Sequence, residues 1–315
     1  MPKHNQFIKK LQSKFLAVNN ALENFFNGLR SLKSNIKKIK FTNNSKAILF
    51  FGISVILVLS YFLIPTFYNK NEVKNIIQNQ IFKNYNIEIK INEKIDYSLL
   101  PKPHFVAKNV LILRDEREIG LVENLKVFIA ANKFFSKNNF KVKDLVFQKT
   151  DLNFYIDDLI FFQDLLKTEP SDNKIIFKNS NLFFKNSYDE ILFINKIKKS
   201  EFYYDSINLV NVLSSENEVF NLPYKLVIKN DKFNKLVDSK FNSKKIRLNV
   251  ENIVYYDEET KNGLLDILFI NKTTSLKYEL KKNSLNFVTK NQKNIYDGLI
   301  EFKPFYLQAN FNYEG

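Results

Sequence analysis

The chain has 315 residues and a formal net charge of +15, and residues 1–46 alone contain nine lysines, Arg30 and a single acid, Glu23. The rest of the excess is spread in mixed sign, and Lys, Asn, Ile and Phe are abundant together, as in products of A/T-rich genomes, so we expect no nucleic-acid partner. The absence of cysteine excludes disulfides, cysteine-bound zinc and thiol nucleophiles.

The first 46 residues form a basic arm with a regular apolar stripe. The apolar residues follow one another at alternating steps of three and four, at Ile8, Leu11, Phe15, Val18, Leu22, Phe25, Leu29, Leu32, Ile36 and Ile39. This spacing predicts an amphipathic helix. Such a helix could lie on an anionic membrane surface, or it could self-associate or bind a partner helix as a coiled coil. Both alternatives remain open.

An apolar segment without charge follows the arm, from Ala47 to Ile64. About 20 helical residues cross the hydrocarbon layer of a membrane, so the segment is long enough to span one. A core helix without a polar face is uncommon in soluble proteins, and a cleaved signal peptide has a shorter apolar region. We therefore predict an uncleaved transmembrane helix over residues 47–66, with anchor positions at Ala47, Phe50, Ile56, Leu59 and Ile64.

The charges on either side of this segment predict its orientation. Lysines are dense on the N-terminal side, whereas the C-terminal side carries only Lys70, Glu72 and Lys74 nearby. Positive charge stays on the cytoplasmic side of membranes. We expect a cytoplasmic N-terminus and a body, residues 67–315, on the other side of a bacterial inner membrane.

The body begins with an amphipathic helix over residues 70–83 and continues as strands. Apolar residues then alternate with polar ones in several segments: 87–91, 152–156, 246–250, 276–280 and 305–311. Alternation with period two predicts a long series of antiparallel strands with one apolar and one wet face. Only residues 157–168 are expected to form a helix within this region.

Motifs for catalysis are missing. The sequence has no G-x-G-x-x-G and no G-x-x-x-x-G-K, and its two histidines, His4 and His104, stand far apart. His104 adjoins the Pro101–Pro103 turn, which favours a structural role. We expect no enzymatic activity, no metal and no cofactor.

The order of parts resembles the N-terminal module of the AsmA-like family of Gram-negative envelope proteins. The resemblance is carried by the turn Ser98-Leu-Leu-Pro-Lys-Pro103, by the strand Asn109-Val-Leu-Ile-Leu113 after it, and by the segments 122–129, 140–156 and 296–307. It is close over residues 65–157 and loose over 158–315. We therefore divide the body into an AsmA-like module, 67–157, and a region of strand repeats, 158–315.

The resemblance implies a long curved antiparallel sheet with an open hydrophobic groove. Family members are thought to carry phospholipid between the inner and outer membranes, so it implies a role in outer-membrane biogenesis with membrane lipid as partner. The groove-lining positions would be Leu152, Phe154, Ile156, Ile246, Leu248, Val250, Phe305, Leu307, Ala309 and Phe311. In the alternative, the apolar faces close into a sandwich core, and the protein is an assembly factor that binds envelope proteins. The last strand ends without a closing element, and we expect a truncated chain.

Overall fold

The computed structural model describes residues 43–114, 117–130, 132, 134, 140–155, 173–186, 188–256, 260–291, 294–302 and 305–313. The chain divides into two compact units, Met1–Ser60 and Tyr61–Gly315. The predicted helix of the basic arm and the predicted helix over 157–168 lie outside the described residues.

The apolar segment forms a helix, α2 (Asn43–Leu63), followed by the short 3-10 helix η1 (Ile64–Phe67). Residues 47–67 are one candidate membrane span, and its most apolar stretch of 18 residues has a mean hydropathy of 2.7 and no buried residue. Phe50 and Ile56 remain 73% and 62% exposed, so this is not a core helix. A helix that is apolar all round and uncovered fits a single-pass membrane protein.

The predicted amphipathic helix is confirmed as α3 (Lys70–Tyr85). The Asn69 side chain caps its first turn by accepting a hydrogen bond from the backbone N–H of Asn71 at 3.0 Å. The helix ends at Asn86, which has a left-handed backbone with φ of 53°. It buries the apolar face formed by Val73, Ile77, Ile81 and Tyr85.

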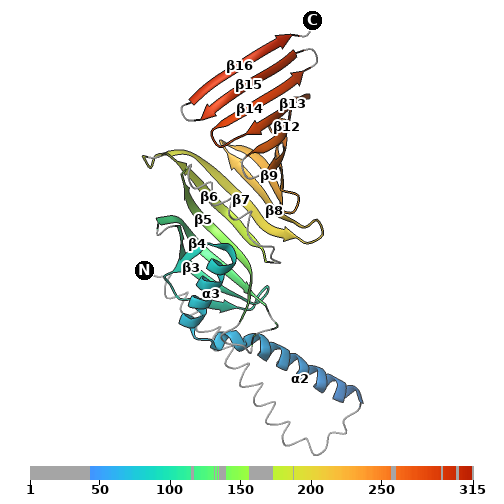
Figure 1. Cartoon of the computed structure of the whole chain (residues 1–315). Coiled ribbons are helices and arrows are strands. Elements are labelled where there is room, and N and C mark those ends of the chain that lie inside the picture. Colours follow the sequence, from blue (N-terminus) through green and yellow to red (C-terminus); the bar gives the residue numbers. More distant parts are fainter. Residues whose placement is uncertain are drawn as a thin grey trace, which may run out of the picture. The chain divides into compact units, whose positions relative to one another are not determined.

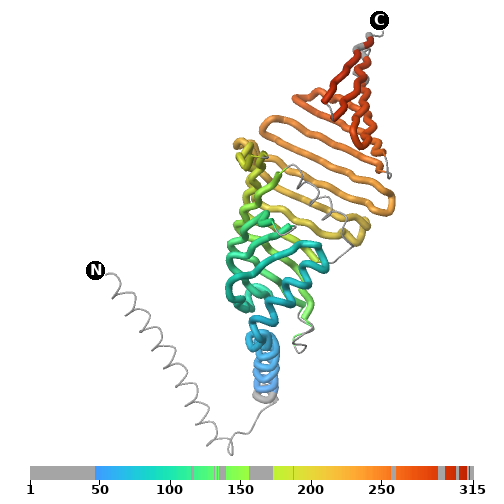
Figure 2. Tube along the Cα trace, turned by 60° about the vertical axis from the view of Figure 1, so that its left-hand side comes forward, coloured from blue at the N-terminus to red at the C-terminus, as the bar shows by residue number. Residues whose placement is uncertain are grey.

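The body is mainly β and forms one sheet of 16 strands, in which successive strands are neighbours and only β2 pairs to the side of β3. Figures 1 and 2 show the strands following one another in chain order. The sheet is not closed, since its order runs from β1 to β16 without a pairing between them. The strands are β1 (Glu88–Ile91), β2 (Asp96–Ser98), β3 (His104–Arg114), β4 (Arg117–Ile129), β5 (Val142–Phe154), β6 (Ile175–Lys185), β7 (Ile191–Asp205), β8 (Val210–Val219), β9 (Leu222–Asp231), β10 (Leu236–Ser243), β11 (Leu248–Tyr256), β12 (Lys261–Phe269), β13 (Lys272–Leu280), β14 (Ser284–Asn291), β15 (Asn294–Phe302) and β16 (Phe305–Tyr313).

The prediction of purely antiparallel strands is wrong at one place. β5 and β6 run parallel, with Leu145 opposite Ile175 and Phe147 opposite Phe177. Parallel neighbours need a crossover connection in place of a tight turn, and the chain between the end of β5 at Phe154 and the start of β6 at Ile175 is long enough for one. The described strands also belong to one sheet and not to the two layers of a sandwich.

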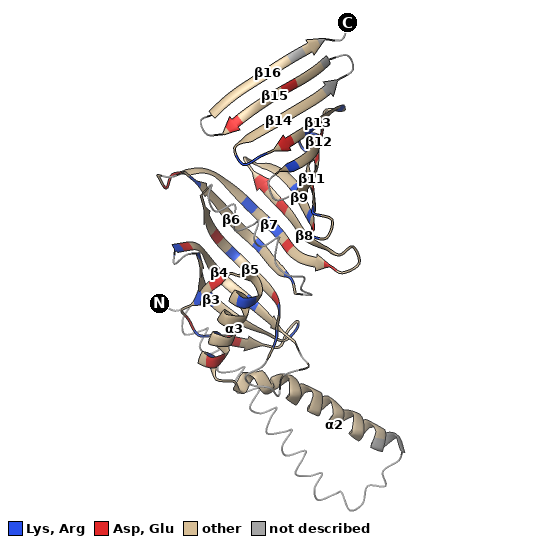
Figure 3. Ribbon diagram, viewed as in Figure 1, with Lys and Arg blue, Asp and Glu red and all other residues tan. Residues whose placement is uncertain are grey.

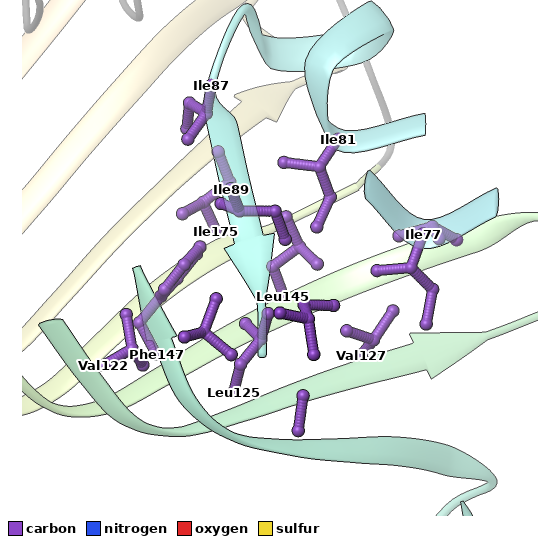
Figure 4. Packing of buried hydrophobic residues seen from close by; sticks show 14 of the residues in the cluster. Ile77, Ile81, Ile87, Ile89, Val122, Leu125, Val127, Leu145, Phe147 and Ile175 are labelled. Carbon is purple, nitrogen blue, oxygen red and sulfur yellow. The ribbon is translucent and has the colours of Figure 1, made fainter. Parts of the chain in front are cut away.

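The core lies where α3 packs on β1 and β5. Figure 4 shows Ile77 and Ile81 of α3 pointing toward Leu125, Leu145 and Phe147 of the sheet. All five side chains are 0% exposed. We call the sheet face that carries them the inner face and the opposite face the outer face.

A row of backbone kinks crosses the first strands. Asn109 in β3, Lys149 in β5 and Asn179 in β6 have φ of 49°, 52° and 50°. The register places Lys149 beside both Glu123 of β4 and Asn179, and the Lys149 Nζ atom lies 2.9 Å from a Glu123 carboxylate oxygen. A residue in this conformation interrupts the alternation of side chains, so that the apolar positions on either side of it share the inner face.

Tyr97 of β2 joins the end of α2 to the sheet. Its hydroxyl donates a hydrogen bond to the carbonyl of Phe62 at 2.6 Å, and burial raises its pKa to about 12. The raised pKa means that the folded state keeps the phenol proton where the unfolded state has lost it. The stability this group contributes is therefore complete below pH 10 and is lost as the pH rises toward 12.

We expect the Tyr97→Phe variant, followed by chemical unfolding in detergent between pH 9 and pH 12, to lose less stability over this pH window than the parent chain. Tyr255→Phe is the matched control because Tyr255 is 60% exposed. Identical pH profiles for the Tyr97→Phe variant and the parent would contradict the assignment.

Candidate functional site

Beyond the core, the inner face continues as a band of apolar side chains. The register places Leu226 of β9 opposite Phe241 of β10, Phe241 opposite Val250 of β11, and Val250 opposite Ile267 of β12. Residues directly opposite in a sheet share a face, so these four side chains form one row. A parallel row follows in β13 and β14, where Tyr278 is opposite Phe287.

Charged residues avoid this face. From β8 to β15, the charges inside described strands fall on positions that the register assigns to the outer face, such as Lys240 and Glu251, whose side chains form an ion pair of 3.0 Å. Lys261 and Lys272 are inner-face exceptions, and each is the first residue of its strand. Figure 3 shows charged segments of both signs scattered along these strands. The register therefore separates a charged outer face from an inner face on which Lys261 and Lys272 are the charged residues of these described strands.

The inner side chains are partly shielded and partly accessible. On the outer face, Ile253 and Leu268 are 37% and 40% exposed. Their inner neighbours in sequence, Val254 and Ile267, are half-buried. In the described part of the chain, each of the strands β9–β13 packs extensively only against the strands next to it in the sheet. The inner face of these strands is thus the more enclosed one, yet it remains reachable.

Three tyrosine–asparagine pairs cross the inner face with the same spacing. The hydroxyls of Tyr224 (β9) and Tyr278 (β13) donate to the Oδ1 atoms of Asn195 (β7) and Asn252 (β11), each at 2.9 Å. Tyr256 (β11) makes the same bond to Asn230 (β9) at 3.1 Å. Each tyrosine spans one intervening strand. Burial raises the pKa of Tyr224 and of Tyr256, so both phenols stay protonated donors at neutral pH.

These pairs satisfy polar groups within the face and lay aromatic rings over it. A buried amide oxygen without a partner would be costly, whereas a paired one leaves the surface effectively apolar. Gly263 of β12 makes room for one such ring, because a Cβ there would lie 2.0 Å from the Tyr278 ring.

We predict that Gly263→Ala displaces Tyr278 and lowers the free energy of unfolding by about 1–3 kcal/mol, the usual cost of overpacking. Chemical denaturation of the detergent-solubilised chain measures the change. Gly52→Ala is the control, because a Cβ there has nothing within 4 Å. Equal stabilities for the two variants would show that the ring does not need this space.

The ten predicted groove residues do not share one environment. Leu152 and Phe154 of β5 are on the inner face but are 3% and 0% exposed, so they belong to the closed core. Leu248 and Val250 of β11 are half-buried on the accessible part of the face. Ile156 lies outside the described residues.

The remaining predicted residues lie at strand ends and at the last strand. Ile246 was expected in a strand, but it falls in the turn before β11, where Arg247 has φ of 53° and breaks the alternation. Phe305 and Leu307 of β16 are 76% and 56% exposed, and Ala309 is also exposed. Register places Phe311 opposite Tyr296, on the same face.

Sequence alternation misses inner-face residues that have an apolar neighbour in the chain. Val227 lies between Leu226 and Ile228, and Leu268 follows Ile267, so an apolar residue stands on the outer face at these points and interrupts the alternation. Only strand register separates the two faces there.

A hollow of 730 Å³ lies over β6–β10, and charged side chains form part of its lining. Its lining includes Lys196, Lys198, Lys225, Lys244, Glu216 and Glu218. Lys196 and Glu218 form an ion pair of 3.1 Å. These charges suit water and ions better than hydrocarbon.

Neither metal nor histidine chemistry is indicated in the described residues. They contain no group of three or more His, Cys, Asp or Glu side chains that could hold a metal ion. His104 is 2% exposed, stacks on Phe128 and has its Nδ1 atom 2.7 Å from the Lys102 carbonyl oxygen. These contacts fit a structural role.

Comparison with protein-family models and with curated proteins gives no match for this chain.

Proposed function

We propose that this chain is a membrane-anchored envelope protein whose inner face holds and conducts phospholipid. The observation that carries the proposal is the apolar band of β9–β16, aligned by register and not sealed by a second described layer. An acyl chain needs a path without water, and each buried CH₂ contributes about 0.8 kcal/mol. Such a path needs no catalytic group, only a continuous apolar wall.

The proposal includes the position of the chain in the cell. Residues 47–67 anchor it in a bacterial inner membrane, the basic arm lies on the cytoplasmic side and the body lies in the periplasm. In chain order the strands follow the anchor one after another, from β1 to β16. These features support membership of the AsmA-like family and a role in outer-membrane biogenesis.

The band also supports the proposal because it presents few groups for specific binding. Its polar groups are largely hydrogen-bonded to one another, as Tyr278 is to Asn252. They therefore offer little for specific binding of an acyl chain. A wall of this kind favours sliding over tight binding, because dispersion and burial depend weakly on position along the chain.

Mass spectrometry of the full chain, extracted in mild detergent and washed, tests the proposal. We expect phospholipids to remain bound and to be exchanged for lipid from added vesicles. The chain should release them when the inner face is disrupted. A preparation that holds no lipid but retains a stoichiometric protein partner would instead support an assembly factor.

A further inference from the structure

The apolar band of the inner face narrows on strand β8. The positions that face inward there are Asn211, Leu213, Ser215, Asn217 and Val219. Three of them are small, polar and buried: Asn211, Ser215 and Asn217 are 3%, 6% and 7% exposed. The Ser215 hydroxyl donates to the Asn217 Oδ1 atom at 2.8 Å. We call these three residues the polar belt.

One row of apolar residues crosses the belt in the described strands β7–β9. Leu213 is opposite Phe202 on β7 and Ile228 on β9. The neighbouring row is polar, because Ser215 is opposite Ser200.

The other rows are interrupted as well. Asn217 separates Ile197 from Tyr224, and Val219 faces Asn195 on β7. Leu213 is therefore the link that joins the apolar core at β1–β6 to the apolar band at β9–β16.

We infer that the belt restricts the path to a single acyl chain at a time, with Leu213 as the apolar contact that crosses it. The inference rests on the proposed function. Inner residues of one strand are about 7 Å apart, so a strip one residue wide fits one hydrocarbon chain. A second chain beside it would lie against hydroxyl and amide groups, which offer less apolar surface to bury than a leucine does.

The test places a photo-crosslinking residue at Ile267 of β12 in the full chain, expressed in a bacterial host. In strand order, β12 lies beyond the belt from the membrane anchor. We expect Leu213→Asn to lower lipid capture at this position about tenfold, the effect of about 1.4 kcal/mol. Ser215→Asn, which introduces the same side chain on the same face, should stay within about twofold of the parent.

A rescue variant separates loss of the path from loss of the fold. Adding Asn217→Leu to Leu213→Asn makes the row from Ile197 to Tyr224 apolar, and capture at Ile267 should recover. Thermal unfolding checks each variant, and Leu213→Thr, with better strand propensity, replaces Leu213→Asn if that variant unfolds.

Equal losses for Leu213→Asn and Ser215→Asn, or no recovery in the double variant, would overturn the inference while the proposed function stands. No lipid captured at Ile267 in the parent chain would overturn the proposed function itself.

Discussion

The Ile267→Asp variant is expected to retain at least about tenfold less phospholipid than the parent chain after extraction and washing. Ile267 is the last residue of the apolar row that starts at Leu226, and an ionised carboxylate there would have to be desolvated beneath an acyl chain. Quantitative lipid mass spectrometry measures the loss.

Leu268→Asp is the matched control for this change. Leu268 is the next residue of the same strand, points to the outer face and is 40% exposed. We expect this variant to hold as much lipid as the parent. Equal loss in both variants would show that the effect comes from a weakened strand and not from the inner face.

The Ile77→Ala variant is expected to lower the free energy of unfolding of the body by about 2–5 kcal/mol. Ile77 of α3 is 0% exposed and packs in the core with the inner face of the first strands, so its removal leaves a cavity. Chemical denaturation in detergent, monitored by circular dichroism, measures the change.

Phe82→Ala on the same helix provides the control, because Phe82 is 55% exposed. Its replacement should change the stability by less than about 0.5 kcal/mol. A large loss for Phe82→Ala together with a small one for Ile77→Ala would mean that α3 packs through its other face.

Strong periodicity made the first elements predictable. The uncharged run of α2, the apolar face of α3 and the alternation of Ile87, Ile89 and Ile91 each depend on local sequence alone, and all three are found in the structure. Their patterns are long enough, or strict enough, to predict a single type of secondary structure.

The pairing of β5 with β6 could not be predicted, because the direction of a strand is not written in its alternation. Nor could the kinks at Asn109 and Lys149, which shift the inward positions by one residue. Ala107 and Val110 both face inward for this reason, although strict alternation would place them on opposite faces.

The sequence predicts that the sheet has an apolar face, but not which strands leave that face accessible. Leu248 and Val250 were found by alternation, whereas Leu152 and Phe154, with the same pattern, are in the closed core. The difference arises from tertiary packing, since α3 covers the first strands and not the later ones. The polar belt on β8 could not be predicted either, because serine and asparagine at inward positions have the sequence pattern of solvent-facing residues.

The most direct test of lipid conduction places a photo-crosslinking residue, one at a time, at adjacent positions of β11 and β12 in the full membrane-anchored chain. The account predicts that Val250 and Ile267 capture phospholipid and that their outward neighbours Glu251 and Leu268 do not. Capture that is equal at inward and outward positions, or absent from all four, would contradict it.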